Sequence, residues 1–184
     1  MRRKTSRTSP KEEADWPGAI HRALKSLRVR QISYVPDAGH KRLIELCQAD
    51  AGMASVPLTT EEEGIGLAAG AWLGGERAAL LMQSSGVGNC VNALTLSANC
   101  GFPLLMLVTM RGEWGEFNPW QVPMGQTTPE TLRLGGVRTL RLERAEEASE
   151  TVTAAAKLAF DGYVAVAVLI SQRLIGTKSF GDKP

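Results

Sequence analysis

Three uninterrupted apolar runs constrain the fold of this chain most strongly. They lie at residues 78–82, 103–108 and 163–170. A strand whose side chains are apolar on both sides must be covered on both sides, which is typical of parallel sheets. Because helical patterns alternate with these runs, the sequence predicts an α/β fold. We expect a doubly wound, mostly parallel six-stranded sheet with helices on both faces.

The other elements follow the same alternation. Hydrophobic spacing and turn residues predict helices over 17–29, 43–46, 61–74, 89–99, 130–134 and 145–160. Short strands are expected at 32–35, 55–58 and 137–140. Ligands of doubly wound sheets bind beyond the carboxyl ends of the strands. We therefore expect one edge of the sheet to gather the loops 36–40, 59–63, 83–89 and 109–125.

Length and charge exclude several classes of protein. The 184 residues suffice for one domain with a core, and a net charge of +2 is too small to indicate a nucleic-acid partner. No apolar run reaches the roughly 18 residues of a membrane span, and no secretory signal is recognisable. We expect a cytoplasmic domain at 16–175, a disordered basic tail at 1–15 and a polar tail at 176–184.

The cysteines and histidines indicate no metal site. Cys47, Cys90 and Cys100 have no CxxC or histidine spacing, which favours reduced thiols in the core over zinc ligands. His21 lies on the first predicted helix and is expected at the surface. His40 lies in a loop after a strand, where a substrate-binding or proton-transfer role and a structural role both remain open. No Ser/His/Asp set with motif spacing supports a hydrolase.

Three glutamates, Glu61, Glu62 and Glu63, open a helix that is rich in glycine and alanine. Acidic side chains favour a helix N-terminus, because the free N–H groups and the macrodipole attract negative charge. The small residues that follow allow another backbone or a ligand to come close. A carboxylate at the start of so tightly packed a helix is either a cap or a chemical group, and the residues leave both interpretations open.

The turn from Ser84 to Asn89 contains Gly86 and Gly88 and leads into a predicted helix. Such a turn resembles a phosphate-binding loop at a helix N-terminus, but it matches neither the Walker A nor the GxGxxG pattern. A serine cap with glycines for tight packing is the alternative. Asn89 and Asn92 lie three residues apart on one predicted helix face, where their amides either face a ligand or are solvated.

The segment 109–125 is long for a loop in a compact domain, which usually indicates function or disorder. It contains Arg111, Trp114 and Trp120. Two tryptophans are too apolar for a disordered linker. We therefore expect the segment to pack against a partner or to cover a ligand.

Residues 60–71, 81–94 and 111–125 together resemble the pyrimidine-binding domain of thiamine-diphosphate enzymes. Within that family they are most similar to sulfopyruvate and phosphonopyruvate decarboxylases, and residues 34–40 look like the first strand and substrate loop of these enzymes. The resemblance covers about residues 17–170. It implies a thiamine-diphosphate-dependent decarboxylase that converts sulfopyruvate, or a similar 2-oxo acid such as phosphonopyruvate, to an aldehyde and CO₂.

The resemblance also implies roles for individual residues. Glu61 is expected to hydrogen-bond ring nitrogen N1′ of the cofactor and to share a proton with it, in an apolar surrounding that raises the pKa of the carboxyl group. The implied catalytic residues are Glu61 and His40. The implied cofactor-binding residues are Glu61, Gln83, Ser84, Ser85, Gly86, Gly88 and Asn89. The implied substrate-binding residues are Asp37, His40, Asn89, Asn92 and Arg111.

One missing motif bears on the partner. The diphosphate half of these enzymes carries a Gly-Asp-Gly segment that binds Mg²⁺ and the diphosphate, and this sequence has no such segment. The resemblance therefore implies a second, β-type subunit that holds both groups, in an α2β2 or larger assembly that is active only when both chains are present. Two other hypotheses remain: a non-catalytic scaffold with the same fold, and a nucleotide-binding regulator that uses residues 84–89.

Overall fold

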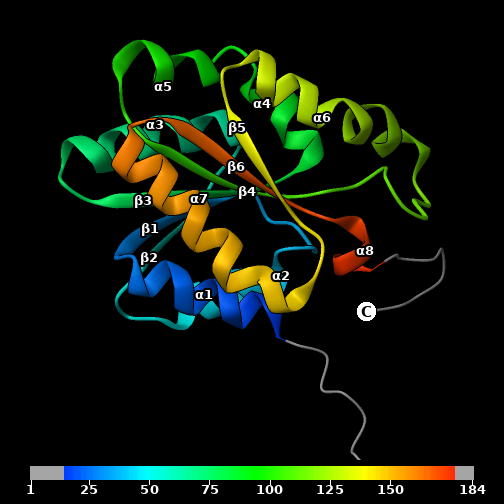
Figure 1. Ribbon diagram of the computed structural model, residues 1–184, viewed down its shortest axis with the longest axis horizontal. Coiled ribbons are helices and arrows are strands. Elements are labelled where there is room, and N and C mark those ends of the chain that lie inside the picture. The colour runs from blue at the N-terminus through cyan, green and yellow to red at the C-terminus, as the bar shows by residue number, and fades with distance from the viewer. Residues whose placement is uncertain (1–14, 177–184) are drawn as a thin grey trace, which may run out of the picture.

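A computed structural model describes residues 15–176 of the chain. The predicted tails lie outside these residues, except for Asp15 and Gly176. Within residues 15–176, six parallel strands form one sheet in the order β2-β1-β3-β4-β6-β5 (Figure 1). They are β1 (Val29–Tyr34), β2 (Ala54–Pro57), β3 (Arg77–Gln83), β4 (Leu104–Thr109), β5 (Arg138–Leu142) and β6 (Ala165–Ile170). The predicted doubly wound α/β fold is confirmed.

Helices cover both faces of the sheet (Figure 1). One layer contains α1 (Trp16–Ser26), α2 (Lys41–Ala49) and α7 (Ala148–Gly162). The other contains α3 (Glu61–Leu73), α4 (Val87–Cys90), α5 (Leu94–Cys100) and α6 (Val122–Leu134). The remaining described elements are the 3-10 turns η1 (Ser84–Gly86), η2 (Pro119–Gln121) and η3 (Ala145–Glu147) and the short helix α8 (Gln172–Ile175). No helix in the described part of the chain is long and apolar enough to cross a membrane.

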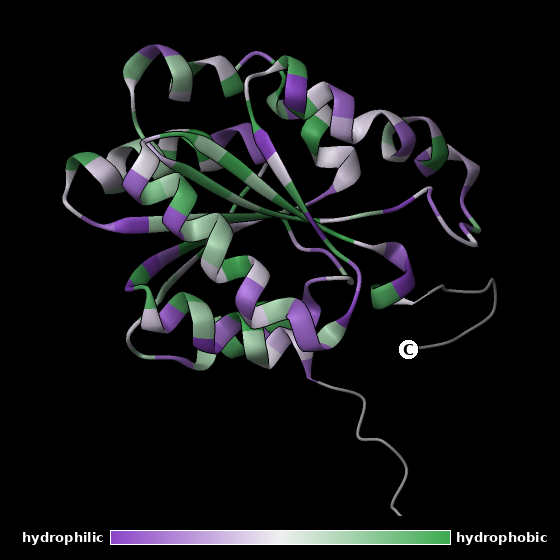
Figure 2. Cartoon of the chain, in the orientation of Figure 1, coloured by the Kyte–Doolittle hydropathy of each residue, from purple (hydrophilic) through white to green (hydrophobic). Residues whose placement is uncertain are grey.

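The central strands supply two separate cores, one on each face of the sheet. Leu81, Leu107 and Val168 belong to the core under α1, α2 and α7. Their neighbours Leu80 and Met106 belong to the core under the opposite layer. Side chains alternate between the two faces along a strand, so a run without polar residues fills both cores at once. Figure 2 shows the resulting hydrophobic colour along these strands.

Several helices differ from the predicted ones. α1 ends at Ser26 rather than at residue 29. The helix predicted at 89–99 is divided into α4 and α5, because residues 91–93 form a turn. Helix α8 has no predicted counterpart, since four residues show too little periodicity.

The helix predicted near 130–134 begins much earlier, at Val122. Pro123 is compatible with a first helical turn, but Pro129 inside the helix and Gly125 both lower its intrinsic propensity. Tertiary contacts compensate for this, because the hydroxyl of Thr128 donates to the backbone oxygen of Ser84 at 3.2 Å. Propensity alone therefore misplaced the start of this helix.

The cysteines follow the prediction in part. Cys47 and Cys90 are buried, but Cys100 is exposed. The prediction of a core position for Cys100 is wrong, because α5 buries Leu94 and Ser97 and turns its last three residues to solvent.

Candidate active site at the carboxyl edge of the sheet

The three glutamates at the start of α3 lie in different surroundings. Glu63 accepts a hydrogen bond from the backbone N–H of Thr59 at 2.9 Å and so caps the N-terminus of the helix. Glu62 is exposed. Glu61 is the buried one, with 7% of its surface exposed. The helix can place Glu61 so deeply because Gly64 lets α3 lie close to β3. A Cβ atom at this position would collide with Leu80 on β3.

The carboxylate of Glu61 is held on one side and open on the other. The amide of Asn89 donates to its Oε2 atom at 2.7 Å. Oε1 makes no hydrogen bond within residues 15–176, and it lies over Gly86, where a Cβ atom would overlap the carboxylate. Beside it, burial and then the charges of Glu61 and Glu62 raise the pKa of the Cys90 thiol to about 12. The sequence motif thus forms a narrow cradle with one free carboxylate oxygen.

The turn after β3 connects this cradle to the next loop. Ser84 is buried, and its hydroxyl oxygen accepts the backbone N–H of Arg111 at 3.1 Å. The hydroxyl of Ser85 donates to Gln83 at 2.9 Å, and the amide of Gln83 donates to Asp37 at 2.9 Å. Ser84 therefore fastens the turn, while Ser85 and Gln83 link it to the loop after β1.

Asp37 occupies the point where the loops after β1, β3 and β4 meet. Besides the bond from Gln83, the hydroxyl of Thr109 donates to its Oδ2 atom at 2.6 Å. Burial by itself would raise the pKa of Asp37, but the neighbouring His40 and these two hydrogen bonds hold it below its ordinary value. The predicted gathering of the strand-end loops is confirmed by these contacts.

His40 lies behind this group, with no exposed surface. Its Nε2 atom is 3.2 Å from the carbonyl oxygen of Met82 and 3.0 Å from that of Leu107, which assigns the ring proton to Nε2, since carbonyls only accept. Burial lowers the pKa of His40, so the ring is neutral near pH 7. A side chain without exposed surface cannot reach a ligand unless it moves. The geometry favours the structural role over substrate contact or proton transfer.

Arg111 is engaged in an ion pair within its own loop. Its guanidinium donates to both carboxylate oxygens of Glu116, at 2.7 and 2.5 Å. Glu116 also accepts from Gln172 on α8, at 2.8 Å. The hydrogen bond from Arg111 lowers the pKa of Glu116 to about 2. The geometry therefore gives Arg111 a loop-holding role, in place of the free cation that a substrate anion would need.

Two close backbone approaches fix the segment after β4. Gly112 has φ +73°, and a Cβ atom there would come within 2.5 Å of the backbone oxygen of Gln121. A Cβ atom at Gly125 would overlap the backbone oxygen of Arg111. The predicted long loop is therefore a packed structure. Its outer end exposes Trp120, with 84% of its surface accessible.

A largely apolar hollow of about 800 Å³ adjoins the cradle. It is lined by Ser85, Asn118, Pro119, Trp120, Pro123, Met124 and Thr127. Ser85 lines the hollow and directly precedes Gly86 of the cradle, and a Cβ atom at Gly88 would contact the sulfur of Met124 at 3.4 Å. The hollow is thus continuous with the turn that packs against Glu61.

The predicted site residues do not all come together. Glu61, Gly86 and Asn89 form the centre, and Ser85, Gln83 and Asp37 adjoin it. Asn92 lies in the turn between α4 and α5 and is exposed, as Asn89 is. Sequence reasoning missed Thr109 and Gln172, although each is a polar residue at or just after the end of an otherwise apolar strand.

The chain matches known proteins over most of its length. A model of the family described as "Thiamine pyrophosphate enzyme, N-terminal TPP binding domain" matches residues 18–123, which is more than half of the chain. The sulfopyruvate decarboxylase subunit alpha of Methanocaldococcus jannaschii is 36% identical over 152 residues, covering 82% of this chain and 90% of that protein. The phosphonopyruvate decarboxylase of Streptomyces viridochromogenes is 35% identical over 113 residues, covering 60% of this chain and 28% of that protein.

The fold has a counterpart among solved structures. A 2-oxoglutarate:ferredoxin oxidoreductase from Magnetococcus marinus superposes with a TM-score of 0.69 at 14% identity, covering 91% of this chain and 31% of that one. At this identity the likeness concerns the fold alone. The family model and the relatives establish that the chain belongs to the thiamine-pyrophosphate enzyme family, as an N-terminal, pyrimidine-side domain of the sulfopyruvate decarboxylase alpha-subunit type.

Proposed function

We propose that this chain is the pyrimidine-binding subunit of a split thiamine-diphosphate-dependent decarboxylase that converts sulfopyruvate to sulfoacetaldehyde and CO₂. The observation that carries the proposal is the buried carboxylate of Glu61, which Asn89 holds by one oxygen above a glycine while the other oxygen stays free. The name of the Methanocaldococcus relative supports the substrate and the reaction.

The residues present fit the aminopyrimidine end of the cofactor. A planar ring needs a narrow, mostly dry cleft, and its nitrogen needs a carboxyl group as hydrogen-bond partner. The cradle of Glu61 over Gly86 offers both. When bound, thiamine diphosphate supplies the electron sink for the electron pair that departing CO₂ leaves behind. Glu61, Gly86 and Asn89 are the residues that we assign to its ring.

The chain's own residues then have distinct tasks. Glu61 holds a proton at Oε1 against the ring, and Asn89 fixes the orientation of the carboxylate through Oε2. Ser85 and Gln83 carry the turn beside the ring and tie it to Asp37, which we place next to the substrate. Preorganisation of this kind lowers the barrier because the groups need not reorient during the reaction.

We assign the diphosphate, its Mg²⁺ and the other wall of the site to a β-type partner. Within residues 15–176, no group of three or more histidine, cysteine, aspartate or glutamate side chains could hold a metal ion. The hollow around Trp120 adjoins the cradle and leaves a large aromatic side chain exposed, which is typical of a protein–protein contact. The relative's designation as a subunit alpha also supports a second chain, in an α2β2 or larger assembly.

Phosphonopyruvate is the second candidate substrate. The match to a phosphonopyruvate decarboxylase favours it, and the two substrates differ mainly in the anionic group at one end. The same residues would perform the same steps on either substrate.

The test combines binding and turnover. Thiamine diphosphate with Mg²⁺ is titrated calorimetrically into the chain alone and into the chain mixed with a purified diphosphate-binding partner, and CO₂ release is then measured with sulfopyruvate, phosphonopyruvate and pyruvate. We expect binding and turnover only in the mixture, with sulfopyruvate as the preferred substrate. Tight cofactor binding by the chain alone would contradict the split site, and preference for phosphonopyruvate would transfer the assignment to the second candidate.

A further inference from the structure

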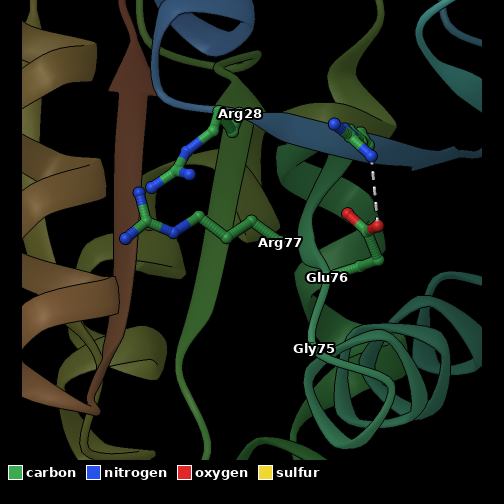
Figure 3. A pocket seen from close by; sticks show the side chains of 5 residues that line it. Arg28, Gly75, Glu76 and Arg77 are labelled. Atoms are coloured by element: carbon green, nitrogen blue, oxygen red, sulfur yellow. Dashed lines mark hydrogen bonds and ion pairs between the residues drawn. The ribbon is translucent and has the colours of Figure 1, made fainter.

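We propose that a hollow at the opposite, amino edge of the sheet binds a small phosphate-bearing anion. The hollow has a volume of about 300 Å³ and is lined by Arg28, Arg30, Gly75, Glu76 and Arg77 (Figure 3). Arg77 begins β3, whereas Gln83 ends it beside the candidate active site. At about 3.3 Å per residue the two sites are roughly 20 Å apart, so the hollow is not part of the decarboxylase site.

Two neighbouring strands bring the arginines together. Arg28 directly precedes β1, and Arg77 is the first residue of the adjacent β3, where it lies opposite Val29. In Figure 3 the guanidinium groups of Arg28 and Arg77 point toward one another. Arg30 instead contacts the carboxylate of Glu76, at 3.4 Å. The sheet register therefore places two positively charged side chains at the same hollow.

Carboxylates balance the charges of this pair only in part. Arg28 has no ion-pair or hydrogen-bond partner for its side chain within residues 15–176. Arg77 donates to the backbone oxygen of Leu27 at 3.0 Å, and its nearest carboxylate, that of Asp161, is 4.0 Å away and 70% exposed. Two positive charges placed together repel one another. An anion between them would attract both guanidinium groups and so offset this repulsion.

The charge of the third arginine, Arg30, is partly neutralised by Glu76. Arg30 lies 3.4 Å from Glu76, and both side chains are largely exposed. Such an exposed pair contributes little to stability and can open without much loss. The free positive charge of the hollow is therefore concentrated on Arg28 and Arg77.

The backbone at Arg28 gives an independent indication. Its φ is +58°, at the position after the end of α1 where glycine is normally preferred. Within the described residues, the other non-glycine residue with positive φ is Tyr163, whose ring packs edge-on against Trp72 at 5.4 Å between centroids. Tyr163 thus has a packing reason for its strain. Arg28 has no such ring contact. Its left-handed backbone ends α1, with its N–H bonded to the backbone oxygen of Lys25 at 3.0 Å, and an arginine in place of glycine there sets its guanidinium at the mouth of the hollow.

The chemistry of the pair selects the ligand. Guanidinium groups present planar forks of N–H donors that match the oxygens of phosphate, and arginine is the usual residue for such recognition. The stacking of Arg77 on the ring of Phe160, 4.8 Å from the centroid, holds its fork in place. A hollow of this size also leaves room for the remainder of a small phosphate ester.

The experiment is a calorimetric titration of inorganic phosphate and pyrophosphate into the full chain, in a chloride buffer free of both. We expect pyrophosphate to bind more tightly than phosphate, and Arg28→Gln and Arg28→Gly each to weaken binding by about 10- to 100-fold. Only Arg28→Gly should raise the Tm, because it also removes the strain at positive φ. Arg22→Gln, which removes an exposed charge from α1, is the matched control and should leave binding unchanged.

Three results would overturn the proposal. The first is no binding of pyrophosphate at millimolar concentration. The second is an equal loss in Arg22→Gln and Arg28→Gln, since this would indicate attraction to overall charge. The third is equal affinity for succinate, which would show that the hollow does not select phosphate. Because the titration needs neither cofactor nor turnover, its outcome is separate from the test of the decarboxylase assignment.

Discussion

The side-chain amide of Asn89 donates a hydrogen bond to Glu61 at 2.7 Å, although the two lie 28 positions apart in the sequence. Glu61 begins α3 and Asn89 lies in α4, so the bond joins two helices at the carboxyl edge of the sheet. It leaves one carboxylate oxygen bound and the other free. This asymmetry lets a single buried glutamate be both fixed in position and available to a ligand.

Glu61→Gln should reduce decarboxylation by the assembled enzyme about 100-fold or more, because the amide cannot take up and return a proton. Turnover of the variant with its partner measures the effect. Glu62→Gln is the matched control, since it removes the same charge from the exposed neighbour. Equal activity of the two variants would remove Glu61 from the mechanism.

Gly86→Ala should displace the Glu61 carboxylate, because the added Cβ atom would overlap it. We expect a loss of about 1–3 kcal/mol in the free energy of unfolding, as for other overpacked sites, together with weaker cofactor binding. Denaturant unfolding of the chain measures the first effect. Gly66→Ala serves as control, since no atom lies within 4 Å of its Cβ position, and it should stabilise α3 slightly. Unchanged stability in Gly86→Ala would contradict the cradle.

The stability of the chain should fall in acid partly through Glu116. Its folded-state pKa of about 2 lies below the ordinary 4.5, so folding favours the ionised form. This contribution is complete above pH 4.5 and is lost as the pH falls toward 2. The free energy of unfolding, measured by denaturant titration across this window, should fall by about 1–2 kcal/mol less in Glu116→Gln than in the wild type. Solvent screening reduces the effect to this size. Glu130→Gln, in an exposed pair with Arg133, should retain the wild-type profile.

Thiol labelling of the folded chain should modify Cys100 alone. Cys47 and Cys90 are buried, and burial raises the pKa of each thiol to about 12, so neither offers a thiolate near pH 8. Mass spectrometry should find one adduct in the native chain and three after denaturation, one for each cysteine. A second adduct in the native chain would show that one of the buried thiols is accessible.

Trp120→Ser should weaken the affinity for the partner subunit about tenfold or more without lowering the Tm of the chain alone, because the side chain is exposed before assembly. The dissociation constant of the two chains measures this. Leu134→Ser, at the C-terminal end of α6 and also exposed, is the control for loss of a surface apolar group. Equal affinity of the Trp120 variant and the wild type would place the partner elsewhere.

The strands and their order of alternation with helices could be predicted from sequence because they depend on local pattern. The runs at 78–82 and 103–108 lack polar residues, and only a strand covered on both faces tolerates this. The start of α6 could not be predicted in this way. Gly125 and Pro129 weaken it locally, and contacts with Arg111 and Ser84 compensate from elsewhere in the chain.

The sequence by itself determined which residues were candidates, because the glutamate and glycine motifs are local and specific. It did not determine which of them share a site. Only the tertiary structure turned Glu61 inward and left Glu62 in solvent, buried His40 against the backbone of β3 and β4, and paired Arg111 with Glu116. Burial, ion pairing and accessibility depend on contacts between residues far apart in the chain, and local pattern carries no information about those contacts.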